Sequence, residues 1–172
     1  MEPGTGPTRD QALDALQDAY QDVTELVAGL DEHELLQPSR CQGWAVRDLL
    51  FHMLLDAQRA LVTLATPATG PPADGCFATQ GHVLTLPSFL ATLVVEAAVH
   101  HLDLVGHLPG RPGPGARPLR LVRSTLDGLL GGAPATGWDD ETYALVGTGR
   151  LPLGDADRAA LGPLADRFPV FG

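Results

Sequence analysis

Apolar residues recur at steps of three and four along much of this chain, and this period is typical of amphipathic α-helices. The first such run spans residues 10–30, with apolar positions at Leu13, Leu16, Tyr20, Val23, Val27 and Leu30. The second spans 45–66, with a wide stripe formed by Val46, Leu49, Leu50, Met53, Leu54, Ala57, Leu61 and Leu64. A third helix is predicted over 87–108. Shorter helices are predicted over 118–130, 139–151 and 156–167.

Four or five amphipathic helices with short connections, and no internal repeat or strand ladder, predict an all-α antiparallel four-helix bundle. We expect one domain over residues 1–172, with the bundle at about 9–131 and a short helical extension at about 132–172. The stretch from Pro67 to Gly75 is rich in proline and glycine and is predicted to be a loop. The following stretch, from Cys76 to Leu86, is predicted to be extended.

Composition and charge limit the binding partners and the cellular compartment that we expect for this protein. Apolar residues make up 44% and charged residues 19% of the chain, as in globular proteins. The formal charge of -10 argues against binding to nucleic acid or to an anionic membrane. The most apolar run, Phe89 to Leu108, contains Glu96, Asp103 and histidines, so we do not expect it to span a membrane. Two cysteines and no signal peptide at the N-terminus predict a cytoplasmic protein with free thiols.

Two polar residues within the third helix are candidates for metal binding. Glu96 and His100 are four residues apart and therefore project from the same helix face. His52, in the second helix, could provide a third ligand, and three protein ligands with an open position are typical of a catalytic metal site. The alternative interpretation is a polar pair on a solvated helix face, with His52 as a hydrogen-bonded core residue.

Other polar residues near this set have secondary predicted roles. Asp103 follows His100 by three residues and could accept a proton from its second ring nitrogen, or could instead pair with His107. His101 points about 100° away from His100 on a helix, so we expect it not to bind the metal. His82 and His33 are interpreted as surface residues.

Three segments resemble those of a known family. The segment CQGWAVRDLLFH, from Cys41 to His52, resembles the "GW-(S/T)-V-R-D-L-x-x-H" signature of the DinB-like superfamily, and EAAVHHLDL, from Glu96 to Leu104, resembles the second signature "E-x-x-V-H-x-x-D-L". The segment from Leu145 to Leu153 is similar to an "L-x-G-R-x-P-L" motif. The branch that matches these features is the mycothiol-dependent maleylpyruvate isomerase family of actinobacterial type.

The resemblance implies a bundle with one divalent metal, commonly zinc, bound by His52, Glu96 and His100, with Asp103 orienting His100. It further implies a transferase or isomerase in which the metal activates a low-molecular-weight thiol, mycothiol or a similar one, for attack on a small electrophile. A cation stabilises a thiolate and makes this nucleophile available at neutral pH. Family members fit a further helix between the two signatures, and Pro67 to Leu86 is too interrupted to form one, so we expect one wall of the substrate pocket to be open.

Two other functions remain open from the sequence. The first is a non-catalytic helical interaction protein, with or without metal, and the second is an enzyme of specialised metabolism that uses the same metal site. An enzyme requires an enclosed pocket beside the metal with one free coordination position, whereas an interaction protein would have a closed or filled site. Pairing into a homodimer is also left open.

Overall fold

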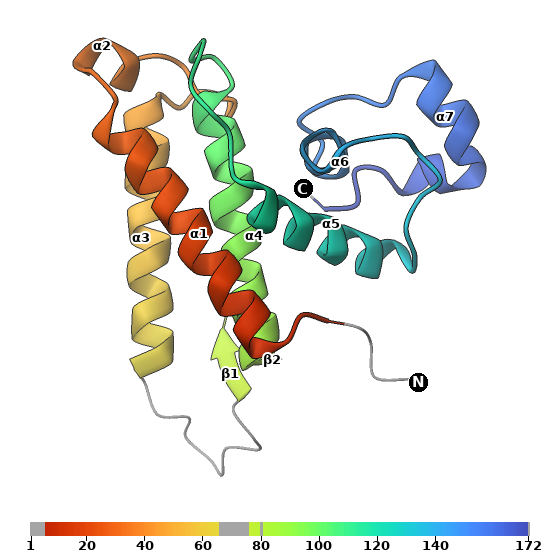
Figure 1. The fold of residues 1–172 in the computed structure, drawn as a ribbon, viewed down its shortest axis with the longest axis horizontal. Coiled ribbons are helices and arrows are strands. Elements are labelled where there is room, and N and C mark those ends of the chain that lie inside the picture. Colours follow the sequence, from red (N-terminus) through yellow and green to blue (C-terminus); the bar gives the residue numbers. More distant parts are fainter. Residues whose placement is uncertain (1–5, 66–75, 80, 172) are drawn as a thin grey trace.

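The computed structural model describes residues 6–65, 76–79 and 81–171 and is mostly helical, which confirms the all-α prediction. The predicted loop over 67–75 lies outside the described residues. The elements in chain order are α1 (Arg9–Ala28), α2 (Glu32–Leu35), α3 (Val46–Ala65), β1 (Cys76–Thr79), β2 (His82–Thr85), α4 (Leu86–Val105), α5 (Ala116–Leu130), α6 (Asp140–Gly147), α7 (Asp155–Leu161) and the 3₁₀ helix η1 (Gly162–Arg167) (Figure 1).

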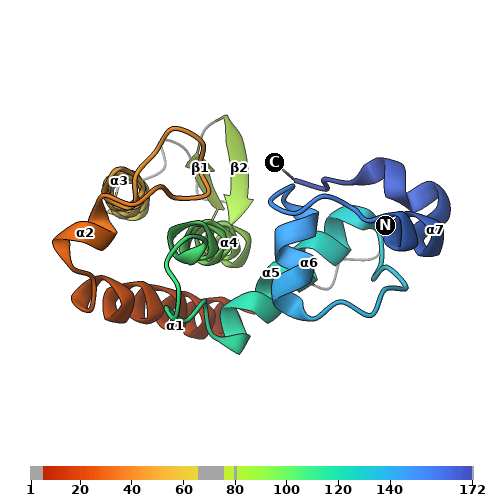
Figure 2. The same cartoon turned by 90° about the horizontal axis from the view of Figure 1, so that it is seen from above.

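Three long helices, α1, α3 and α4, lie side by side, and α5 begins beside α1 and α4 and leads away from them toward the C-terminal helices (Figure 1). Figure 2 shows α4 between α1 on one side and the β1–β2 hairpin on the other. The hairpin is antiparallel and pairs Cys76 with Thr85. The extended conformation predicted for this stretch is confirmed, but the expectation of no strand ladder is wrong, because these two short strands pair with each other.

Helix α4 forms the centre of the core. It begins at the cap of Thr85, whose side chain accepts a hydrogen bond from Ser88 N, and has a proline in its first turn. It is long and apolar enough to cross a membrane, with a mean hydropathy of 1.4, yet 67% of this stretch is buried inside the protein. A helix that is apolar on nearly all sides must be covered by neighbours, and α4 fits the core of a soluble protein.

The buried face of α1 differs from the predicted one. Leu13 and Val27 are exposed, whereas the fully buried positions are Ala12, Ala15 and Ala19. Small side chains let the backbones of α1 and α4 approach closely, and the larger residues then lie to the side of this contact line. The period of α1 was therefore predicted correctly, but its apolar positions are buried only in part: Leu16, Val23 and Leu30 pack against the core, whereas Leu13 and Val27 are exposed.

The wide apolar stripe of α3 is also only partly buried. Val46 and Leu49 are buried against α4, while Leu54, Leu61 and Leu64 are exposed. These positions face away from α4 because α3 packs on the bundle along one side (Figure 2). The apolar stripe of α3 is therefore wider than the part of its surface that neighbouring elements cover.

The C-terminal region packs on α5 and α4. Helix α5 ends at Gly131, whose left-handed φ of 82° closes the helix. Tyr143 of α6 is completely buried, stacks near Trp138 and donates a hydrogen bond to Asp127 at 2.9 Å. The predicted helix over 139–151 ends early, at Gly147, and the one over 156–167 is divided into α7 and η1. The division at 131/132 between bundle and extension stays a prediction.

Candidate metal centre

Helix α3 provides His52 and the carboxylate of Asp56, which was not predicted from the sequence. The helix begins after Trp44, and the backbone N–H of Ala45 donates to Asp48 at 3.0 Å. His52 Nε2 lies 3.0 Å from Asp56 Oδ2, one turn further along the helix. The ring of Trp44 packs edge-on against the His52 ring, with centroids 5.3 Å apart. The same four-residue spacing that identified Glu96 and His100 could have identified Asp56.

Helix α4 provides Glu96, His100 and Asp103 on one face. His100 Nε2 lies 3.4 Å from Glu96 Oε2, and His100 Nδ1 lies 3.1 Å from Asp103 Oδ2. The His100 ring also contacts the His52 ring at right angles, with centroids 5.2 Å apart. The structure therefore brings His52, Glu96 and His100 together between α3 and α4.

Asp103 is bound by residues from three parts of the chain. It is almost completely buried, at 1% exposure, and Arg150 donates to it through Nε at 3.0 Å and through Nη2 at 2.9 Å. The thiol of Cys41 lies 3.5 Å from the same carboxylate. The pairing with His107 that the sequence left open is replaced by this contact with Arg150. Neither Arg150 nor Cys41 was predicted, because their distance from Asp103 in sequence gives no local signal.

These contacts shift the pKa values of the side chains around Asp103. Burial alone would lower the pKa of His100, but hydrogen bonds to Asp103 and Glu96 outweigh it and raise this pKa to about 9. Burial would raise the pKa of Asp103, but hydrogen bonds from His100 and Arg150 outweigh it and lower this pKa to about 2. The hydrogen bond with His100 also lowers the pKa of Glu96. Burial, together with the charge of Asp103, raises the pKa of Cys41 to about 11.

Two sets of residues could hold a metal ion, and both contain His100. In the predicted set, the 3.4 Å between Glu96 Oε2 and His100 Nε2 matches the separation of about 3.3–3.6 Å for two ligands around one tetrahedral zinc. The ligand atoms of His52, Glu96 and His100 do not all lie within 4.8 Å of one another, and His52 would have to turn its ring from Asp56 to complete this set. In the second set, ligand atoms of Cys41, His100 and Asp103 lie within 4.8 Å of one another.

The charges around each set favour the first. Asp103 is already paired with the permanent charge of Arg150, and a metal would have to displace that contact. Cys41 must lose its proton to bind a metal, and its raised pKa opposes this at neutral pH. Glu96 and His52, by contrast, border an open pocket. The donor set of two imidazoles and a carboxylate suits zinc.

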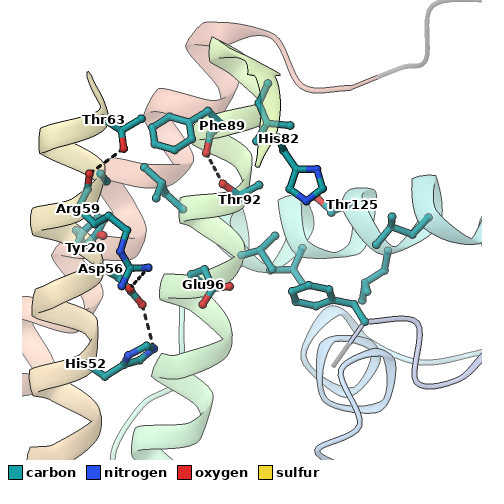
Figure 3. A pocket seen from close by; sticks show the side chains of 18 residues that line it. Tyr20, His52, Asp56, Arg59, Thr63, His82, Phe89, Thr92, Glu96 and Thr125 are labelled. Carbon is teal, nitrogen blue, oxygen red and sulfur yellow. Dashed lines mark hydrogen bonds and ion pairs between the residues drawn. The ribbon is translucent and has the colours of Figure 1, made fainter. Parts of the chain in front are cut away.

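A pocket of about 610 Å³ adjoins this centre, between α3 and α5 with α4 at its back (Figure 3). Figure 3 places His52, Asp56 and Glu96 toward one end and Thr63, Phe89 and His82 toward the other. The open wall expected from the sequence stays a prediction, because residues 66–75 lie outside the described part of the chain; among the described residues, the β2 strand and Phe171 of the C-terminal segment line this pocket. His82 is exposed, as predicted, and also borders the pocket.

His101 and His33 also lie outside the centre. His101 is buried, and its Nε2 lies 3.2 Å from the carbonyl oxygen of Pro112. His33 is exposed on α2 and contacts Gln37.

We expect the metal-free protein to lose stability as the pH rises from about 6.5 to 9. The folded pKa of His100 is above its ordinary value of 6.5, so its stabilising contribution is complete below 6.5 and is lost as the pH passes about 9. The expected fall in Tm is on the order of 5 °C. Thermal melts in a chelator should show this fall in the parent and a smaller one in His100→Gln. Equal falls in both proteins would contradict the assignment.

Comparison with known proteins identifies part of the chain. Residues 16–83 match the family model of the mycothiol maleylpyruvate isomerase N-terminal domain, which confirms the resemblance drawn from the sequence. The matched stretch extends from α1 through α3 into β2, so it includes His52 and ends before Glu96 and His100. No curated protein and no solved structure matches the chain.

Proposed function

We propose that this protein is a cytoplasmic, metal-dependent transferase or isomerase, because residues 16–83 match the family model of the mycothiol maleylpyruvate isomerase N-terminal domain. It would use mycothiol or a similar low-molecular-weight thiol, and act on a small electrophilic substrate. The metal ligands would be His52, Glu96 and His100, with zinc as the metal.

The observation that supports this proposal is that His52 and Glu96 line a large pocket and that both contact His100. A divalent cation bound there would stabilise the thiolate form of the cofactor at neutral pH. Asp103 would accept the Nδ1 proton of His100 and thereby leave Nε2 with its lone pair directed toward the metal position. Arg150 holds Asp103 in place for this role.

The pocket favours an enzyme over a helical interaction protein. Its volume of about 610 Å³ lies within the range of small-molecule sites, and it borders His52 and Glu96 directly. An interaction protein that retained the bundle without turnover would have no need for a space beside these residues.

We expect thiol-dependent turnover to require a bound metal. The purified protein would be loaded with zinc and assayed with mycothiol and maleylpyruvate, and then with other electrophiles, by following the loss of substrate. Chelation should abolish turnover and zinc should restore it, because the thiolate is formed at the metal. The control is the same assay without mycothiol. A zinc-loaded protein that consumes no thiol and converts no electrophile would contradict an enzymatic function and favour the interaction protein.

A further inference from the structure

The two sides of the pocket differ in charge. Asp56, Arg59 and Glu96 lie on the side formed by α3 and α4, near His52 (Figure 3). The opposite side, formed by α5 and the C-terminal segment, presents Leu126, Leu129 and Phe171 and contains no charged side chain among the described lining residues. A ligand that fills the pocket would therefore have one end near polar groups and a body in an uncharged environment.

The charged side offers little to an anionic ligand. Arg59 is the one described lining residue with a permanent positive charge, and its Nη1 lies 3.0 Å from Asp56 Oδ1. Glu96 adds a second carboxylate, so the lining has more acidic than permanently basic groups. In the metal-free protein, a carboxylate on the ligand would lose water without gaining an unpaired permanent cation from the lining side chains, and this costs free energy.

Three threonines line the pocket, and their hydroxyl groups already donate hydrogen bonds within the protein. The hydroxyl of Thr63 donates to Arg59 O at 3.0 Å, and that of Thr92 donates to Phe89 O at 2.7 Å (Figure 3). The hydroxyl of Thr125 donates to Leu121 O at 3.0 Å. Each donor is satisfied within its own helix, so none needs a ligand acceptor. Phe89, held by stacking on Phe77 with centroids 5.8 Å apart, adds an aromatic surface.

We propose that the pocket binds an uncharged, largely apolar substrate rather than a small dicarboxylate. Its reactive group faces the end with His52 and Glu96, and its apolar body lies against Phe89, Leu129 and Phe171. This inference deepens the proposed function by naming its substrate class. It can nevertheless be tested by binding alone, without metal, thiol or turnover.

The test compares two probes that share a bicyclic ring, naphthyl methyl ketone and naphthoate, of which only the second is charged. Calorimetric titration of the metal-free protein should give a Kd for the ketone at least roughly tenfold lower than for naphthoate or maleate. Leu129→Glu, at a half-exposed position that tolerates a charge, should weaken ketone binding by about tenfold or more. The matched control is Leu36→Glu, at a similarly exposed position outside the pocket lining.

Several outcomes would overturn the proposal. These are equal or tighter binding of naphthoate, no binding of the ketone, or ketone binding that Leu129→Glu leaves unchanged while circular dichroism shows a folded variant. If the ketone binds as expected but the zinc-loaded protein converts no electrophile in the presence of thiol, the pocket assignment stands and the proposed enzymatic function fails. The two hypotheses are thus separated.

Discussion

Substitution of His100 by alanine is expected to abolish metal binding, with a loss of affinity on the order of 100-fold or more. His100 is the single residue that both candidate ligand sets share. Changes to residues that merely orient a ligand already cost about 10- to 100-fold in metal affinity, so removal of the ligand should cost at least as much. Elemental mass spectrometry after zinc loading should give about one metal per parent chain and almost none in His100→Ala.

Two further variants identify the correct set. Glu96→Ala should lose the metal if the predicted set holds it, whereas Cys41→Ser should retain it. The opposite pattern would assign the metal to Cys41, His100 and Asp103 and would make the predicted set wrong. Retention of zinc by His100→Ala would exclude both sets. Thermal melts of each metal-free variant provide the control for folding.

Substitution of Asp103 by alanine is expected to cause the largest loss of stability, about 3–5 kcal/mol. The variant would leave the Arg150 guanidinium and the protonated His100 in a partly buried environment without their counter-charge. The expected fall in Tm is on the order of 10 °C. Measurement would be by thermal and urea unfolding of the metal-free protein at pH 7.

Two matched variants test whether the loss of stability comes from leaving buried charges without a partner or from the loss of any ion pair. Asp18→Ala removes the partner of Arg117 in a pair that lies 2.7 Å apart but is half exposed, and it should cost no more than about 1 kcal/mol. The double variant Asp103→Leu with Arg150→Met removes both charges and should recover much of the lost stability. If Asp103→Ala unfolds no more easily than Asp18→Ala, Asp103 does not have the structural role described above.

The helices were largely predictable because their period is a local property of the sequence. Which face each helix buries was less predictable, since that depends on the neighbour. The alanines of α1 are buried because close approach to α4 favours small residues, and hydropathy alone ranks leucine above alanine. Leu54 and Leu61 of α3 are exposed because the fold leaves that face uncovered. The β1–β2 ladder was missed because each strand has only four residues.

The candidate site was predictable to the extent that spacing within one helix determines contact. The pair of Glu96 and His100, and the contact of His100 with Asp103, follow from steps of four and three residues. His52 was named as a candidate third ligand from its place in the second helix, but no local rule relates it to α4, and the family resemblance was the further support for it. The contact of Arg150 with Asp103 depends on how the segment after α6 returns to α4, and nothing in the sequence around either residue specifies it.

The contact of Arg150 with Asp103 couples the folding of the region after α5 to ligand binding at the candidate metal centre. A transient opening of this region would break two charge-assisted hydrogen bonds and leave Asp103 without the guanidinium of Arg150. A ligand that binds His100 and holds it against Asp103 favours the closed form, and by reciprocity the closed form favours that ligand. Occupancy of the centre and docking of the C-terminal segment therefore stabilise each other by the same free energy.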